Sequence, residues 1–144
     1  MAEIKMDVAQ LQEFLEQVFP QVHQDFDVVE VTKEGVRVRL TVRDAHLRPG
    51  GTVSGPSMFA LADVGMYLAV LSRIGPEALA VTTNCSIDFM RKPAAGVGMT
   101  CDVRLLKLGR VLAVGDCLIY SDGDTRPVAR ASLTYSIPPI SGVK

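Results

Sequence analysis

The stretch from Ser54 to Leu71 constrains the fold more than any other part of this sequence. It reads as a helix that is apolar on nearly every side, built mainly from Ala, Leu, Val, Met and Phe. A helix that is hydrophobic all round belongs inside a protein rather than on its surface. Asp63 lies in its middle, and a buried carboxylate is costly unless it is paired, hydrogen-bonded or neutralised. The fold must therefore bury this helix and give Asp63 a role.

Composition narrows the class of protein. The chain has 144 residues, 48% of them apolar and 22% charged, which is typical of a soluble globular protein and predicts a single domain over residues 1–144. The net charge of −1 gives no reason to expect nucleic acid or a membrane surface as partner. No uninterrupted apolar run is long enough for a membrane span, and the N-terminus lacks the layout of a signal peptide. We therefore expect a cytoplasmic protein.

The cysteines and histidines do not suggest a metal site. Cys85, Cys101 and Cys117 lie in three separate strand-like runs, and His23 and His46 stand apart from one another. A structural zinc site needs closely spaced Cys and His ligands. We expect three buried free thiols and no metal.

The remaining sequence predicts an α+β fold. Apolar residues at helical spacing indicate an amphipathic helix over about residues 7–19, capped by Asp7 and ended by Pro20. Strand-like runs cover residues 28–32, 36–43, 79–90, 97–108, 111–120 and 128–137. Short turns between consecutive strands favour an antiparallel sheet. We expect this sheet, within about residues 28–137, to curl around the central helix at about residues 56–73.

The start of the central helix has features of an anion-stabilising site. Ser54 is a candidate N-cap, and Pro56 suits a first turn, where its missing N–H costs no hydrogen bond. Gly55 allows another group to approach the backbone closely. The free amides here, that of Gly55 included, carry partial positive charge and are suited to polarising a carbonyl oxygen.

Several stretches also occur together in a specific order: Gly51–Pro56, Phe59–Asp63, Thr83–Ala94 and Leu105–Arg110. In combination they resemble the hotdog-fold thioesterases of the phenylacetate-pathway (PaaI-like) family, over about residues 35–137. The resemblance implies a hotdog fold, a curled sheet wrapped around one long helix. It also implies hydrolysis of acyl-CoA thioesters without metal or cofactor, with coenzyme A as part of the substrate.

The resemblance implies roles for three residues by position. Asp63 corresponds to the family's catalytic acid, and Gly55 to the glycine whose backbone N–H faces the thioester carbonyl. Thr82 corresponds to the strand hydroxyl that helps to hold the attacking water. Strict alternation along the strand, however, places Thr82 on the side away from the helix unless the strand contains a bulge. Thr83 is the alternative candidate for this hydroxyl. The face of the strand that carries Thr82 can also lie in a subunit interface.

The chain departs from the family pattern at three positions next to this site. Arg48, Ser54 and Pro56 stand where the family usually has Asn, His and a second Gly. All three are candidates for substrate binding. Arg48 either donates to the thioester carbonyl or a substrate carboxylate, or is a surface arginine of the loop.

Four cations at turns are candidates for binding the phosphates of coenzyme A: Arg91, Lys92, Lys107 and Arg110. Charge-assisted hydrogen bonds would favour arginine in that role. The alternative is that these residues are only solvent-exposed turn residues that favour solubility.

Within this framework the sequence leaves several functions open. Asp63 acts as a general base on water or as a nucleophile, or it is a structural acid satisfied by neighbouring donors. The alternatives to a thioesterase are a non-catalytic acyl-CoA-binding hotdog domain and a hotdog hydratase or dehydratase. The last needs a well-placed histidine, for which only His46 lies near. The apolar helix and Tyr67 favour an apolar acyl or aryl group.

The expected fold also predicts association. One curled sheet around a helix leaves sheet edges that need cover. The resemblance implies a homodimer with the site shared between two subunits, and further pairing as a dimer of dimers.

Overall fold

The longest element of the computed structural model, which describes residues 2–139, is the central helix α2, Gly55–Ile74. Ser54 caps it, because the Ser54 hydroxyl oxygen accepts the N–H of Ser57 at 3.3 Å. Gly75 ends it with a φ of 95°, a conformation that favours glycine. These bounds confirm the predicted central helix. By length and a mean hydropathy of 1.4, α2 meets the requirements of a membrane span, but 72% of that window is buried inside the fold, as in the core helix of a soluble protein.

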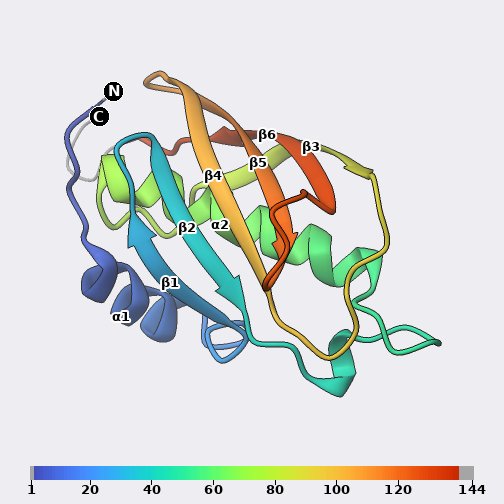
Figure 1. Cartoon of the computed structure of the whole chain (residues 1–144). Helices are drawn as coiled ribbons and strands as arrows, with labels where there is room; N and C mark the ends of the chain where they lie inside the picture. Colours follow the sequence, from blue (N-terminus) through green and yellow to red (C-terminus); the bar gives the residue numbers. More distant parts are fainter. Residues whose placement is uncertain (1, 140–144) are drawn as a thin grey trace.

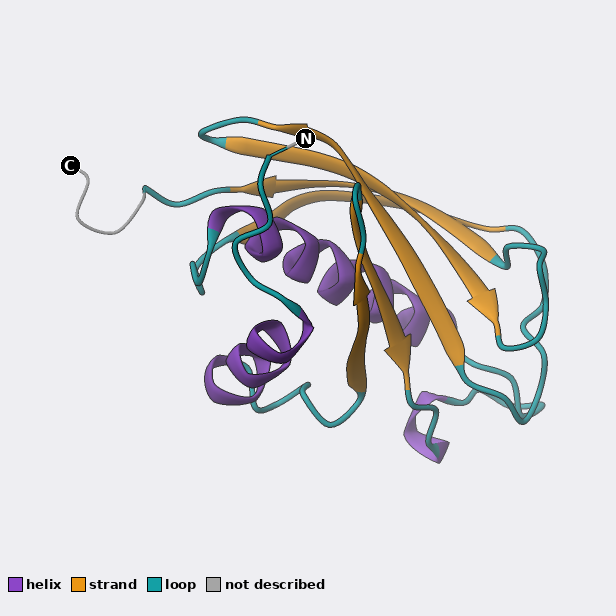
Figure 2. Cartoon of the chain, turned by 60° about the vertical axis from the view of Figure 1, so that its left-hand side comes forward, coloured by secondary structure: helices purple, strands orange, loops and turns teal. Residues whose placement is uncertain are grey.

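Six strands form one antiparallel sheet in the order β1-β2-β4-β5-β6-β3. They are β1 (Phe26–Val31), β2 (Gly35–Leu40), β3 (Val81–Phe89), β4 (Met99–Leu108), β5 (Leu112–Ser121) and β6 (Ala129–Ser136), with a short 3-10 turn at Asp44–His46. Figures 1 and 2 show the strands curving over α2, which runs beneath the concave face. The predicted α+β arrangement, a curled sheet wrapped around one long helix, is confirmed.

Two glycines let α2 approach the sheet closely. A Cβ on Gly65 of α2 would lie 3.0 Å from Val103 Cγ2, and a Cβ on Gly115 of β5 would lie 2.7 Å from Met66 Sδ. A larger residue at either position would force the neighbouring side chain to move. The resulting core includes Leu61, Leu68 and the other fully buried side chains of α2.

The two edges of the sheet differ. Helix α1 (Val8–Val18) packs beside β1 and is fastened to it, since Gln12 donates to Phe26 O at 3.1 Å and accepts from Val28 N at 2.8 Å. Asp7 caps α1 in a capping box, which confirms the predicted N-terminal helix. The opposite edge strand, β3, has no strand paired along its outer side within the described residues, and none of its residues is buried. An uncovered edge strand is a ready template for pairing with another chain.

A bulge in β3 decides where its threonines point. Thr82 pairs with Tyr135 of β6, but Asn84 pairs with Thr134, so the register shifts across Thr83. Tyr135 is buried against α2, and Thr82 shares its face. The strand therefore contains the bulge named above as the exception to strict alternation, and Thr82 faces the helix rather than away from it.

The cysteines are free. Cys101 and Cys117 are buried as expected, whereas Cys85 on β3 is only half-buried. Among residues 2–139, no three His, Cys, Asp or Glu side chains come together as a metal site would require.

Candidate active site

Asp63 is held by two hydroxyl groups from neighbouring strands. Thr82 of β3 donates to Asp63 Oδ1 at 2.5 Å, and the Tyr135 hydroxyl of β6 donates to the same oxygen at 2.8 Å. Neither donates to Oδ2. Hydrogen bonds to an ionised group are about twice as strong as neutral ones, so the two donors fix the carboxylate in one orientation. One oxygen is thus anchored while the other stays available for chemistry.

Tyr135 is a site residue to which the sequence pattern assigned no role. Its side chain is 3% exposed, and burial, reinforced by the negative charge of Asp63, raises the pKa of its hydroxyl above the ordinary value. The hydroxyl therefore keeps its proton and donates throughout the working pH range. The signal was present: alternation in the last strand turns Tyr135 inward, and a buried tyrosine hydroxyl needs a partner.

A pocket of about 450 Å³ opens next to Asp63. The end of α1 and the residues after it form one wall with Val18, Phe19 and Gln21. Tyr67 forms another and meets Phe19 edge to face, with ring centroids 6.2 Å apart. The acid therefore borders a space with an aromatic wall and of the size that small ligands occupy.

Gly55 lies in a different pocket of about 630 Å³ at the start of α2. Arg48, Arg91 and Lys92 line this pocket with it, so three of the predicted substrate-binding cations do come together. Gly55 is the first residue of α2, where helix geometry provides no acceptor for its N–H. The ring of Phe89 lies beside it, 3.4 Å from the position that a Cβ would take.

Other predicted residues are placed differently. The Ser54 hydroxyl is engaged in the helix cap, and Pro56 is exposed in the first turn. Thr83 donates to the carbonyl oxygen of Thr134 at 3.2 Å, across the strand pair and away from Asp63. Lys107 is exposed near the end of β4, and Arg110 lies in a third pocket at the far end of α2.

Asp63 and Gly55 do not meet within one chain. They are eight residues apart in the same helix, which corresponds to about 12 Å along its axis. Since a thioester carbonyl cannot touch groups this far apart, a pairing of Asp63 with the Gly55 amide of its own helix is excluded. A site that uses both residues needs a second subunit.

His46 is engaged in structural contacts. Its ring is buried, its Nδ1 accepts the Arg43 N–H at 2.8 Å, and its Nε2 lies 3.4 Å from Asp25. Burial by itself raises the pKa of Asp25, but hydrogen bonds from Arg43 and His46 outweigh it and lower the pKa. With both ring nitrogens occupied, His46 is poorly placed to act as the acid or base of a hydratase.

The ten arginines of the sequence fall into two groups. Six are within 4 Å of a carboxylate: Arg37, Arg39, Arg43, Arg104, Arg126 and Arg130. The other four pair with no carboxylate among the described residues, and all four line pockets: Arg48 and Arg91 beside Gly55, Arg73 and Arg110 at the far end of α2. The arginines without a carboxylate partner are therefore gathered at two places.

Comparison with known proteins agrees with this fold. The sequence profile of the thioesterase superfamily matches residues 50–128, more than half of the chain, and the chain therefore belongs to the thioesterase superfamily. A solved structure from Silicibacter sp. TM1040, named a "putative thioesterase", is 57% identical, with 95% of each chain covered and a TM-score of 0.89. A mutant of phenylacetic acid degradation protein PaaI from Thermus thermophilus is 28% identical, with 83% of this chain and 99% of that chain covered and a TM-score of 0.70.

A sequence relative points the same way. The Pseudomonas aeruginosa protein named "Putative esterase PA0474" is 32% identical over 102 residues, which is 70% of this chain and 74% of that protein. The predicted hotdog fold and the resemblance to PaaI-like thioesterases are thus confirmed. Family membership supports a thioester hydrolase.

Proposed function

We propose that this protein hydrolyses coenzyme A thioesters of apolar acyl or aryl groups to the free acid and coenzyme A. The observation that carries the proposal is the Asp63 carboxylate, anchored by Thr82 and Tyr135 at the edge of a pocket with an aromatic wall. Membership of the thioesterase superfamily supports the reaction class. The aromatic wall of Phe19 and Tyr67 supports an apolar acyl group.

In this mechanism the free oxygen of Asp63 does the chemistry. As general base, Oδ2 takes a proton from water, the water oxygen attacks the thioester carbonyl, and a tetrahedral oxyanion forms. The C–S bond then breaks, and the thiolate of coenzyme A leaves and is protonated. As nucleophile, Oδ2 attacks the carbonyl itself and gives a mixed anhydride that water hydrolyses. Trapping with hydroxylamine distinguishes the routes, because only the anhydride yields a hydroxamate on Asp63.

The Gly55 N–H is our candidate donor to the oxyanion. Because Asp63 and Gly55 are about 12 Å apart along one helix, the donor would come from a second subunit. The open edge strand β3 supports a homodimer, and exposed apolar side chains lie on it or next to its ends: Leu79, Val81, Phe89 and Met90. Two such edges pairing would give shared sites, and two dimers would make the predicted dimer of dimers.

A pair of substitutions tests the Gly55 amide itself. Gly55→Pro deletes the N–H at a first-turn position where proline is tolerated, and Ser54 already has the extended conformation that precedes proline. We expect kcat to fall about 100-fold, the typical cost of removing one oxyanion donor. Gly55→Ala keeps the N–H and serves as the matched control. Equal losses in both variants would contradict the role, provided that both melt like the wild type.

Arg48, Arg91 and Lys92 are the proposed partners of the coenzyme A phosphates, because they line the Gly55 pocket and none of them forms a salt bridge with a carboxylate among the described residues. Replacing Arg91 and Lys92 by Gln should raise KM and leave kcat nearly unchanged, since these contacts would be equal in the ground and transition states. A fall in kcat alone would contradict phosphate binding. Lys107 and Arg110 lie outside this pocket, so a phosphate role for them receives no support from its geometry.

One alternative function is supported by a specific observation. Ser54, which stands at the family's histidine position, is committed to the helix cap, and this favours a domain that binds acyl-CoA without turnover. Free-thiol release from aryl-, short-chain and medium-chain acyl-CoAs separates the two functions. We expect turnover of at least one class and a fall of about 100- to 10,000-fold in Asp63→Asn, the contribution of a general base.

Asp116→Asn, a change to a sheet carboxylate paired with Arg104, is the control and should leave turnover unchanged. Binding without thiol release from any substrate would favour the non-catalytic domain. Turnover by Asp63→Asn within a few-fold of the wild type would remove Asp63 from the mechanism.

A further inference from the structure

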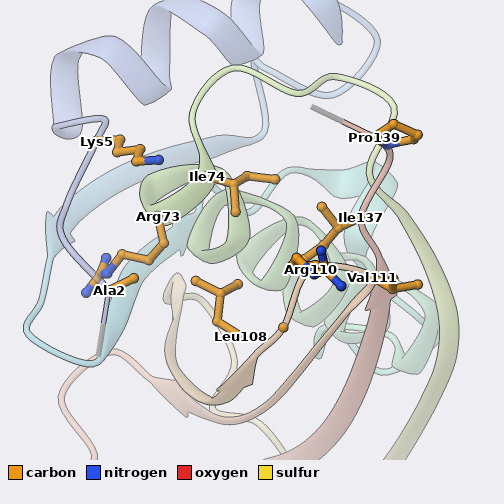
Figure 3. Close-up of a pocket in the computed structure, with 10 residues that line it drawn as sticks. Ala2, Lys5, Arg73, Ile74, Leu108, Arg110, Val111, Ile137 and Pro139 are labelled. Carbon is orange, nitrogen blue, oxygen red and sulfur yellow. The ribbon is translucent and has the colours of Figure 1, made fainter. Parts of the chain in front are cut away.

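The third pocket, of about 550 Å³, lies at the C-terminal end of α2 (Figure 3). It is bounded by Arg73 and Ile74, by the turn between β4 and β5, and by Ile137 after β6. Arg73 follows Asp63 by ten residues of the same helix, about 15 Å along its axis. The lining residues of the two pockets do not overlap, so this is a separate site.

Its charge is unusual for this protein. Lys5, Arg73 and Arg110 line it, and no described Asp or Glu does, whereas the whole chain has a net charge of −1. Six other arginines have carboxylate partners within 4 Å, but Arg73 and Arg110 have none among residues 2–139. The pocket thus concentrates positive charge that the fold itself does not neutralise.

Arg73 contributes a buried positive charge to this pocket. The side chain is 2% exposed, and its hydrogen bonds go to neutral oxygens: Ser72 Oγ at 2.6 Å, Thr32 O at 2.6 Å and Lys33 O at 3.0 Å. Its Nε has no hydrogen-bond partner among the described residues. A buried charge without a counter-charge is costly, so an anion nearby would be stabilised.

The rest of the pocket is apolar. Figure 3 shows Ile74 and Leu108 in the middle, Arg73 on one side, Arg110 beside Ile137 and Val111 on the other, and Lys5 above. The matching ligand has a hydrocarbon body to cover the apolar residues and a single anionic group at the cationic rim. The volume lies within the range of small-molecule sites.

We propose that this pocket binds an aliphatic carboxylate. The chain lies on Ile74 and Leu108, and the carboxylate is held by Lys5 and Arg110 in the field of the buried Arg73. Lys5 and Arg110 are exposed and can move to meet it. The free acid released by the proposed reaction belongs to this ligand class, but binding here does not depend on that reaction.

The test is a titration of the full-length protein, labelled at its isoleucine methyl groups, with octanoate followed by NMR. Ile74 and Ile137 line the pocket and should shift saturably, whereas the buried Ile119 of β5 should not. The neutral analogue 1-octanol should bind at least about tenfold more weakly, since a charge-assisted hydrogen bond contributes a factor of this order. Equal binding of octanol, or no saturable shift of Ile74 and Ile137, would overturn the proposal.

Variants locate the anionic contact. Arg110→Gln should weaken octanoate binding about tenfold. Arg126→Gln, a matched change to an exposed arginine of another turn, should have no effect. Asp63→Asn should still bind octanoate. Octanoate binding therefore tests this pocket independently of whether Asp63 is catalytic. If coenzyme A alone shifts Ile74 and Ile137 and displaces octanoate, the pocket belongs to the nucleotide and the proposal is wrong.

Discussion

The sheet, rather than the helix, sets the orientation of the Asp63 carboxylate, because two hydroxyl groups from the sheet donate to one of its oxygens. Thr82 and Tyr135 reach it from β3 and β6, which are paired at these two residues. A shift in that pairing would move both donors at once. The proposed role of Asp63 therefore depends on how β3 and β6 are paired.

The first prediction concerns these donors. Thr82→Val and Tyr135→Phe each remove one hydroxyl while nearly preserving shape, and each should lower kcat by roughly tenfold, the cost of one hydrogen bond to a charged group. Thr82→Ser keeps the hydroxyl and should restore most of the activity. Steady-state kinetics with the best substrate of the panel provide the measurement. Unchanged kcat in both Thr82→Val and Tyr135→Phe would show that Asp63 needs no anchoring.

The second prediction uses a thiol as a reporter of Asp63. Burial, followed by the negative charge of Asp63, raises the pKa of Cys85 to about 11. The thiolate is the reactive form, so only about one thiol in a thousand should react readily at pH 8. Removing the carboxylate charge lowers this pKa, and Asp63→Asn should therefore be alkylated faster at Cys85.

The measurement is the iodoacetamide labelling rate of Cys85 by mass spectrometry between pH 7 and 10. In the wild type the rate should still be rising at pH 10, since the pKa lies above this range. Asp88→Asn, at an exposed acid three residues further along the strand, should label like the wild type. Identical rates in Asp63→Asn and the wild type would mean that the carboxylate charge does not reach Cys85.

At the scale of elements, the third prediction asks whether Ser54 caps α2 or contacts substrate. Loss of an N-cap costs about 1 kcal/mol, so Ser54→Ala should lower the free energy of unfolding by that amount. Ser54→Asp keeps an N-cap acceptor and should lose little stability. Denaturant unfolding measures both. If Ser54→Ala raises KM strongly without loss of stability, the hydroxyl serves the substrate and not the helix.

The elements themselves were largely readable from the sequence, because each is set by local periodicity. The all-apolar run predicted α2 to within one residue at each end, and alternation located all six strands. The direction of Thr82 was not readable, because a bulge depends on which residues of β6 lie opposite. Alternation turned Tyr135 inward, but its partner could not be identified, because Asp63 is 72 residues away in the chain. The separation of Asp63 from Gly55, in contrast, follows from helix geometry alone.

At the scale of the whole molecule, the fourth prediction tests shared sites. If each site takes Asp63 from one subunit and Gly55 from the other, then Asp63→Asn and Gly55→Pro are each inactive alone. A mixed dimer places both defects in one site and leaves the other intact. Random mixing makes half of the dimers mixed, so activity should return to about a quarter of the wild-type value.

Co-expression with two affinity tags allows the mixed dimers to be purified, and the purified mixed dimers should have about half of the wild-type activity, since one of their two sites is intact. Activity equal to the average of the two inactive parents would rule out a shared site. Sedimentation of the wild type should show a dimer or a larger species, and a monomer would lead to the same conclusion.

The fifth prediction locates the interface. Ser86→Lys places a charge on the open edge β3, where two copies would bring like charges together, and it should shift the sedimentation equilibrium towards monomer and lower activity. Val29→Lys makes the matched change on the opposite edge strand, β1, and should leave the assembly intact. Dissociation by Val29→Lys but not by Ser86→Lys would move the interface to the other edge.

The wall that α1 contributes to the pocket of Asp63 has an evolutionary consequence. Val18 and Phe19 border the proposed acyl site, yet they belong to a peripheral helix end and not to the hotdog core. Substitutions or length changes there alter the shape of the space offered to an acyl group while α2, Thr82 and Tyr135 keep their positions. Substrate preference can then diverge among descendants of this chain without any change in the proposed catalytic residues.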